Sequence, residues 1–562
     1  MPDVFPIRGT FGQICFMARL TIVFLLIANC LFSQSNTPKL VVGIVVDQMR
    51  YDYLYRYSAQ FGPDGFKRLL REGLSCENNH YDYIPTFTGP GHACVYTGAG
   101  PAGNGIVANE WWDREQNRHR YVTSDLQQKT VGADGKSGQH SPAVLLSTTI
   151  TDELRLSNNF RSKVVGVCLK DRGSILPAGH IPNACYWFDD KTGNWITSTY
   201  YPDSLALPQW VQNFNGLKKT ETYCNQVWDR LPGVTYQESF ANWANKYDRG
   251  KYAVSLTGGF PHNLAAIRKK MGMGVIRFTP FGNTLTLDFA IEAMEQMQLG
   301  DDAFTDFLCL SFSCTDYAGH QFGVHAEETE DVYIRLDRDI ARLLYYLDKK
   351  YGKDNVLVFL TADHGGTETP AHLKDIGIPA DVFPESKLDS ALTEVLRLGF
   401  HTPVDLIQEV SNQQVWLDLK KLDSLQLNKT IALEMIKNYL QPLPGIYAVH
   451  TIAEVMNLPG DLFYAPVLRK GIYVKRSGDL VFQLDPNWHP DDNLFLLGGA
   501  THGSSYAYDT HVPLLWYGNG IRPGTLYAPT SECDIAPTVS AILHIMEPSA
   551  NTGKVIERVM ER

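Results

Sequence analysis

Leu40-Val-Val-Gly-Ile-Val-Val46 is an unbroken apolar run, and the residue that follows it is Asp47. Seven apolar residues in a row are typical of a strand that is buried on both faces, as in a parallel sheet covered by helices. Similar runs recur along the chain at 164–169, 307–312, 356–360 and 513–517. Helical patterns lie between the runs, so the sequence predicts an α/β fold with a mostly parallel central sheet and helices on both sides.

Two helices are expected between these strands. Ser141-Pro142 favours a helix start, with serine as the N-cap and proline as the first helical residue, leading into 144–156. Apolar residues recur every three or four positions from Val332 to Leu347, which marks one face of a longer amphipathic helix. We expect this second helix to end at Gly352, directly before the next strand.

Two regions interrupt the alternation of strands and helices. Residues near 175–260 are rich in Trp, Tyr, Pro and Asn, and residues near 400–490 predict a small α+β segment. In the second region we expect a helix over 431–440 and a strand pair around 471–484. Both regions are interpreted as cap insertions within one catalytic domain that spans 37–562.

The N-terminus has the pattern of a secretory signal peptide. Leu20–Phe32 is a short apolar run that follows Arg19 and ends in polar residues at Ser33. It falls short of the roughly 20 apolar residues that a membrane span needs. We therefore expect a leader over 1–33, a mature chain without a membrane span, and a periplasmic or secreted location. Whether Met17 is the true start and whether Cys30 is lipidated stay open.

Composition excludes some partners and leaves other questions open. The 562 residues carry a net charge of −11 with acids and bases interspersed, and without a basic block we expect no nucleic-acid binding. Of the ten cysteines, eight lie beyond the leader and none forms a Cys-x-x-Cys pair, so a thiolate zinc site is not expected. Disulfide pairing cannot be read from the sequence. The oligomeric state also stays open, with a monomer slightly favoured.

Polar residues stand just past several of the predicted strands. Asp47, Asp316 and Asp363 follow three of the runs, and Lys170 and Arg172 follow a fourth. Functional groups collect at the carboxyl ends of strands in such sheets. We therefore expect these five side chains to share one site.

Aspartates and histidines in three segments favour metal binding. Asp363 and His364 are adjacent in Thr-Ala-Asp-His-Gly-Gly, Asp316 and His320 are four residues apart, and His502 lies in a glycine-rich turn. Zinc accepts carboxylate oxygen and imidazole nitrogen as ligands. A capping turn, a surface turn and a loop histidine are the alternatives for the separate segments. Their occurrence together favours two zinc sites.

A threonine provides a candidate nucleophile. Thr88 lies in Pro85-Thr-Phe-Thr-Gly-Pro-Gly-His92, just before an apolar stretch that predicts a helix start. Backbone amides and the helix dipole at such a position favour a bound anion. Thr86 is the rival nucleophile, and an ordinary capped loop is the alternative without catalysis.

Taken together, these segments make the chain resemble the alkaline phosphatase superfamily, specifically its bacterial, exported, threonine-nucleophile zinc phosphomonoesterases. The resemblance runs from Leu40 to the C-terminal helix and implies an alkaline-phosphatase-like α/β/α sandwich. It also implies two Zn²⁺ per chain. One zinc would be held by Asp47, Thr88, Asp363 and His364, and the other by Asp316, His320 and His502.

The resemblance implies the remaining site residues and the reaction. Asn109 would bind a phosphoryl oxygen together with the Gly89 amide, and the Lys170–Arg172 pair marks the monoesterase branch. Small phosphate monoesters would be hydrolysed to alcohol and inorganic phosphate through a covalent phosphothreonine at Thr88. The alternative is a phosphodiesterase or nucleotide pyrophosphatase on the same fold. A sulfatase is disfavoured because no Cys-x-Pro-x-Arg segment is present, and a zinc-binding protein without catalysis is a further alternative.

Overall fold

The computed structural model describes residues 37–561 apart from 203–204, 239–258, 463 and 492–498. The leader expected over 1–33 lies outside the described residues. Within the described part of the chain, no helix is both long enough and apolar enough to cross a membrane.

A ten-stranded sheet forms the centre of the fold, in the order β21-β2-β20-β13-β1-β12-β7-β8-β9-β6. Its five middle strands, from β13 to β8, run parallel, whereas β20 and β9 pair antiparallel to their neighbours. The predicted mostly parallel sheet is thus confirmed. The strands that correspond to the five apolar runs are β1 (Leu40–Val46), β7 (Val164–Cys168), β12 (Asp306–Phe312), β13 (Val356–Thr361) and β20 (Leu514–Gly518).

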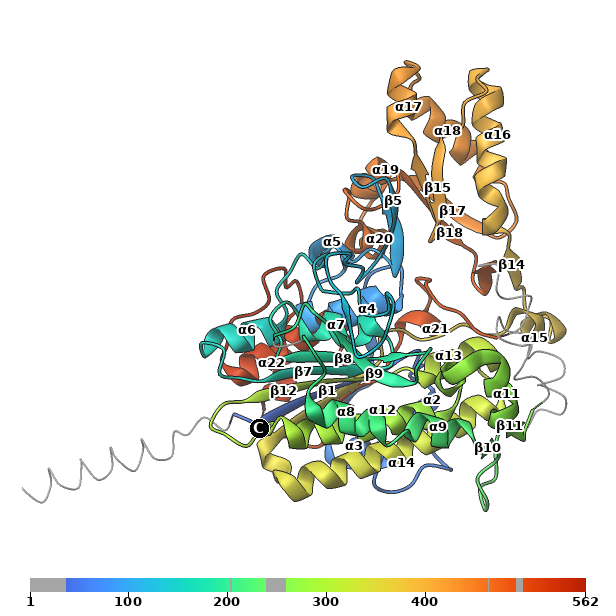
Figure 1. Ribbon diagram of the computed structural model, residues 1–562. Helices are drawn as coiled ribbons and strands as arrows, with labels where there is room; N and C mark the ends of the chain where they lie inside the picture. The colour runs from blue at the N-terminus through green and yellow to red at the C-terminus, as the bar shows by residue number, and fades with distance from the viewer. Residues whose placement is uncertain (1–36, 203–204, 239–258, 463, 492–498, 562) are drawn as a thin grey trace, which may run out of the picture. The chain divides into compact units, whose positions relative to one another are not determined.

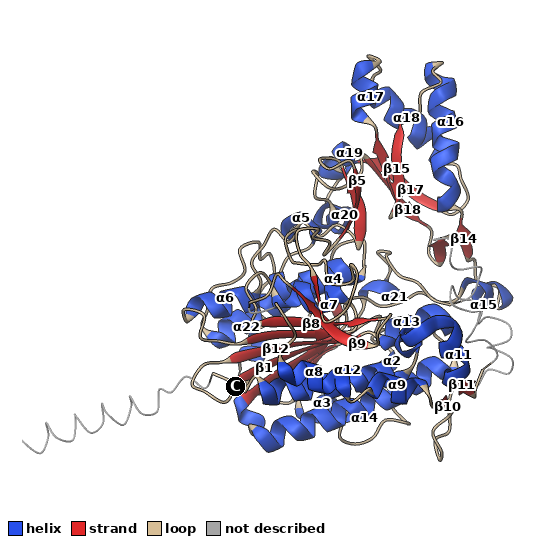
Figure 2. Ribbon diagram, in the orientation of Figure 1, coloured by secondary structure: helices blue, strands red, loops and turns tan. Residues whose placement is uncertain are grey.

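Helices cover both faces of this sheet (Figures 1 and 2). Alternate residues of β1 point to opposite faces, so Val42 and Ile44 belong to one apolar core and Val41 and Val45 to another. On the first face lie α2 (Tyr53–Arg56), α3 (Phe66–Glu72), α8 (Gln209–Gly216), α12 (Pro280–Gln296), α13 (Cys314–Phe322) and α14 (Glu327–Lys350). On the second lie α4 (Thr88–Thr97), α6 (Ile150–Ser157), α7 (Asp171–Ala178) and α22 (Ile535–Leu543). This arrangement confirms the expected α/β/α sandwich.

A second, smaller sheet lies within the region near 400–490, where the α+β segment was expected. It has the order β15-β16-β18-β17 and its own apolar core. Its elements are α16 (Leu388–Phe400), β15 (Ile407–Ser411), β16 (Gln414–Leu417), α17 (Leu419–Ser424), α18 (Lys429–Leu440), β17 (Ile446–Thr451) and β18 (Leu480–Leu484). We call this segment, 388–484, the insert.

Two local predictions for the helices and strands need correction. Helix α6 begins at Ile150 rather than near 144, because Thr149 and Asp152 form a reciprocal capping box. The strand pair expected around 471–484 is wrong in its first half. Gly471 is the last residue of the helix α20 (Ala465–Gly471) and does not begin a strand. The second strand of the expected pair, β18, pairs with β17 and β16.

The region near 175–260 is also different from the predicted cap insertion. Its strands β8 (Ala184–Asp189) and β9 (Asn194–Ser198) extend the central sheet beyond β7. The aromatic residues that suggested an insertion, such as Trp187 and Trp195, are buried in the two cores of that sheet. Residues 239–258 of this region lie outside the described residues.

Candidate active site

Strand register brings the predicted site residues to one edge of the sheet. Val46 pairs with Phe312 on one side of β1, and Val45 pairs with Thr361 on the other. Asp47, at the end of β1, is therefore level with the ends of β12 and β13. Asp316 follows β12 in the first turns of α13, and Asp363 follows β13.

The six expected metal ligands form two groups. In each group, the candidate donor atoms lie within 4.8 Å of one another. The structure thus brings together side chains that the sequence separates by as many as 455 positions. The first group is Asp47, Asp363 and His364, and the second is Asp316, His320 and His502.

The first group is completely buried. His364 Nε2 lies 3.5 Å from Asp47 Oδ1 and 3.6 Å from Asp363 Oδ2. His364 Nδ1 lies 2.9 Å from the carbonyl oxygen of Gly365, and it must carry the proton because a carbonyl can only accept. The unprotonated Nε2 then faces the two carboxylates, as a metal-ligating imidazole requires.

The second group repeats this arrangement. His320 Nε2 lies 3.0 Å from Asp316 Oδ1, and its Nδ1 donates to the Ala500 carbonyl oxygen at 2.7 Å. His502 Nδ1 donates to the Thr86 carbonyl oxygen at 2.7 Å, and its Nε2 lies 3.8 Å from Asp316 Oδ1. Backbone carbonyls therefore fix the orientation of both rings relative to the shared carboxylate.

The charges and the unsatisfied atoms of the first group fit a bound cation. Asp47 Oδ1 and Asp363 Oδ2 are buried and have no hydrogen-bond partner within the described residues. Burial, together with the nearby charges of Asp316 and Asp363, raises the pKa of Asp47 well above its usual range. Buried carboxylates of this kind are stable when they coordinate a metal.

Lys170 connects the two groups. Its buried Nζ lies 2.6 Å from Asp47 Oδ2 and 2.6 Å from Asp316 Oδ2, and 5.1 Å from the ring centroid of Tyr317. Burial lowers the pKa of Lys170, but the charges of Asp316 and Asp47 outweigh that effect and raise it. The lysine therefore stays protonated between the two groups.

Thr88 lies beside the first group. It is the first residue of α4, it is buried, and its Oγ1 lies 3.5 Å from His364 Nε2. The rival Thr86 donates its hydroxyl proton to the Ser504 carbonyl oxygen at 3.0 Å, which holds that hydroxyl in a structural contact. The geometry thus favours Thr88 over Thr86 as the reactive hydroxyl.

Asn109 contacts the same helix start. Its Oδ1 accepts a hydrogen bond from the Gly89 backbone N–H at 2.7 Å. A Cβ at position 89 would lie 3.1 Å from this oxygen, so glycine permits the close approach of Asn109. The Asn109 amide group is thereby fixed next to Thr88.

Arg172 is held by a side chain that the sequence did not single out. Its Nη1 donates to the Tyr121 hydroxyl at 2.9 Å, and that hydroxyl donates to Asp171 Oδ1 at 2.7 Å. Arg172 Nε is buried and has no hydrogen-bond partner among the residues described. A donor that is fixed in position and unpaired suits an anionic ligand.

Two further residues of the site were missed from the sequence. Gln48 donates from its backbone N–H to Asp363 Oδ1 at 3.1 Å and from Nε2 to Asp316 Oδ1 at 2.9 Å. His92 Nδ1 donates to the Thr88 carbonyl oxygen at 2.9 Å. The sequence offered one signal for each residue: Gln48 directly follows Asp47, and His92 lies one helical turn after Thr88.

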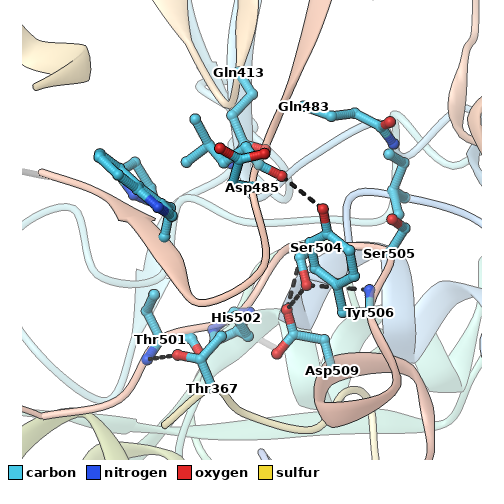
Figure 3. A pocket seen from close by; sticks show the side chains of 14 residues that line it. Thr367, Gln413, Gln483, Asp485, Thr501, His502, Ser504, Ser505, Tyr506 and Asp509 are labelled. Atoms are coloured by element: carbon cyan, nitrogen blue, oxygen red, sulfur yellow. Dashed lines mark hydrogen bonds between the residues drawn. The ribbon is translucent and has the colours of Figure 1, made fainter. Parts of the chain in front are cut away.

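A small pocket, with a cavity volume of about 20 Å³, borders His502. Figure 3 shows that Gln413 and Gln483 of the insert line it together with Tyr506 and Asp509, which follow His502 in sequence. Gln483 Nε2 and Asp509 Oδ1 are buried there without a hydrogen-bond partner in the described part of the chain. The insert therefore contributes polar side chains next to the second ligand group.

An α/β/α sandwich with two ligand groups at its strand ends and a hydroxyl at a helix N-terminus defines a member of the alkaline phosphatase superfamily. Within it, the model for type I phosphodiesterase / nucleotide pyrophosphatase matches residues 41–505, and the chain belongs to this family. The resemblance inferred from the sequence is confirmed.

Relatives match along almost the whole chain. Alkaline phosphatase PafA of Elizabethkingia meningoseptica is 42% identical over 93% of this chain and 95% of its own length, and PhoV of Synechococcus elongatus is 41% identical over 93% of each. A protein of Myroides odoratus named calcium-transporting ATPase is 43% identical over 93% of this chain and 95% of its own. The crystal structure of PafA matches with a TM-score of 0.87, covering 93% of this chain and 99% of that one.

Proposed function

We propose that this protein is an alkaline phosphatase that hydrolyses small phosphate monoesters to an alcohol and inorganic phosphate. The observation that carries the proposal is the position of Thr88, at the N-terminus of α4 and 3.5 Å from His364 in the first ligand group. The names of PafA and PhoV support the same activity.

Two zinc ions are the proposed cofactors. The first group, with Thr88 as a further oxygen ligand, and the second group together supply three imidazoles and three carboxylates. This mixture favours zinc over magnesium, which prefers oxygen ligands. Zinc in these positions would stabilise negative charge on phosphoryl and hydroxyl oxygens.

Thr88 is the proposed nucleophile. Its Oγ1 attacks phosphorus, a bond forms between Oγ1 and phosphorus, and the bond from phosphorus to the alcohol oxygen breaks with departure of the alcohol. Water then hydrolyses the phosphothreonine and restores the hydroxyl. The N-terminus of α4 and the amide of Asn109 stabilise the charge on the phosphoryl oxygens.

Lys170 and Arg172 support a preference for monoesters over diesters. A monoester carries up to two negative charges, and two cations near the phosphoryl group would match that charge. The unpaired Nε of Arg172 provides a donor for one oxygen. A diester has one charge fewer and would leave part of this cationic surface without a partner. The alternative, a phosphodiesterase, is favoured only by the description of the matched family.

A solved variant of PafA is consistent with these assignments. Its substitutions fall on a threonine, an asparagine 21 residues later, and a lysine and an arginine two residues apart. In this chain, Thr88 and Asn109 are also 21 positions apart, and Lys170 and Arg172 are two apart. The matching spacing supports the choice of these four residues.

The proposal also assigns roles to the insert, as a cap over the site, and to the leader, as an export signal. The polar side chains of Gln413 and Gln483 beside His502 support a cap over the leaving group. The apolar run of the leader and the polar residues after it support export to the periplasm or the medium.

Turnover of p-nitrophenyl phosphate and bis-p-nitrophenyl phosphate, before and after chelation, tests the function. We expect a higher kcat/KM on the monoester, loss of activity with chelator, and recovery with zinc. ATP should be included, because the Myroides relative is named an ATPase. A higher kcat/KM on the diester would reverse the choice of branch, and no turnover of any substrate would favour a binding protein.

A further inference from the structure

A cysteine of the helix that carries Thr88 meets a second cysteine that lies far away in the sequence. The sulfur atoms of Cys94 and Cys533 lie 3.2 Å apart, and both side chains are buried. The residues are 439 positions apart. A disulfide bond is about 2.05 Å long, so the sulfur atoms would need to approach by only about 1.2 Å to form one.

The backbone around this pair is already held in place. Helix α4 packs against α22 and against η4 (Glu532–Asp534), the short helix that contains Cys533. The carbonyl oxygen of Gly98, at the end of α4, accepts hydrogen bonds from the N–H groups of Thr552 at 2.8 Å and Gly553 at 3.2 Å. A bond between the sulfur atoms would therefore join segments that are adjacent without it.

The environment of this pair differs from that of other buried thiols. Across the residues that the structure describes, the cysteines at 168, 185, 224 and 314 have oxygen atoms of serine side chains or backbone carbonyls as their thiol partners. Cys94 and Cys533 instead have each other as partners, and the Cys533 thiol also donates to Asp82 Oδ1 at 3.7 Å. Their contact is the sulfur–sulfur arrangement that oxidation requires.

We propose that Cys94 and Cys533 form a disulfide in the exported protein and fasten the nucleophile helix to the C-terminal segment. Each thiol gives up its proton, and the two electrons reduce the disulfide of a thiol oxidase or of glutathione to two thiols. Exported proteins meet such oxidants, whereas cytosolic ones are kept reduced. The bond closes a very long loop, which constrains the unfolded chain strongly.

Counting thiols in the full-length protein tests the bond directly. The protein is purified from the compartment to which it is exported, without reductant, and is alkylated in denaturant. Eight cysteines lie beyond the leader, and we expect six to be alkylated. A digest without reductant should yield one peptide pair that joins residues 94 and 533. Eight alkylated cysteines, or a bond between other residues, would overturn the proposal.

Thermal unfolding tests the consequence for stability. With zinc held constant, tris(2-carboxyethyl)phosphine should lower the Tm of the wild-type protein by about 5 °C. Cys533→Ala should start at a lower Tm and respond little to the reductant. The matched control Cys185→Ala, also a buried thiol, should keep the response of the wild type. An equal response in all three proteins would contradict the bond, and the phosphatase assay is not needed for this result.

Discussion

The imidazole rings of His364 and His502 stack face to face, with centroids 3.5 Å apart and planes inclined by 15°. Each ring belongs to a different ligand group, so this stack joins the two groups. Gly499 lies three residues before His502. Its φ is +72°, and a Cβ there would lie 2.1 Å from the His320 carbonyl oxygen. The glycines around His502 therefore allow the turn to approach the second group closely.

Loss of His502 should remove one metal ion and keep the other. His502→Ala should bind about one zinc per chain instead of two, and kcat/KM on p-nitrophenyl phosphate should fall at least 100-fold. Metal content by mass spectrometry and steady-state rates measure both effects. The exposed His544 provides the control, since His544→Ala should bind two ions. Two ions in both variants would refute the assignment of His502.

Replacement of Thr88 should abolish the covalent step. Thr88→Ala should lose about 10³-fold or more in kcat and form no phosphoenzyme, whereas Thr88→Ser should retain part of the activity because it keeps a hydroxyl. Acid quenching with radiolabelled substrate detects the phosphoenzyme. Thr86→Ala should keep labelling, because its hydroxyl contacts Ser504. Labelling that survives in Thr88→Ala and is lost in Thr86→Ala would reverse the assignment.

The Tyr121 hydroxyl should act on substrate binding through Arg172. Tyr121→Phe removes the oxygen that accepts from Arg172 Nη1, so KM for a monoester should rise about tenfold with a smaller change in kcat. The kcat/KM for a diester should change little. Tyr527→Phe, at an exposed position, is the control. Equal losses on the monoester and the diester would argue against a specific effect on Arg172.

Glu532 should make stability depend on pH. Burial raises the pKa of its carboxyl group to about 8, although Asn79 and Thr361 donate hydrogen bonds to its Oε1. The folded protein therefore holds this proton at pH values where the unfolded chain releases it. The contribution to stability is complete below about pH 4.5 and is lost as the pH rises towards 8.

The matched variant for this test is Glu532→Gln, which keeps an acceptor oxygen and cannot ionise. Between pH 5 and 8, the free energy of unfolding should fall more steeply for the wild type than for Glu532→Gln. The difference in slope is at most about 1.4 kcal/mol per pH unit, the value for one proton. Denaturant titrations of both proteins at constant zinc measure the difference. Parallel pH profiles would show that Glu532 does not titrate in this range.

Some predictions could be made from local patterns because the physical cause is local. An unbroken apolar run such as 40–46 avoids water when it forms a strand that is buried on both faces. Asp47, which follows the run, then lies at the edge of the sheet. The same reasoning placed Asp363 and Lys170. The start of α6 could also have been found locally, since Thr149 and Asp152 have the spacing of a capping box.

The sequence by itself determined the α/β class, the strands that carry the site, and the residue types that gather there. Only the tertiary structure decided that β8 and β9 extend the central sheet, that Tyr121 holds Arg172, and that Cys94 meets Cys533. The reason is physical. Burial and helix capping depend on residues that are neighbours in the sequence. The three contacts depend on strand register and helix packing between distant segments, which come together only when the chain folds.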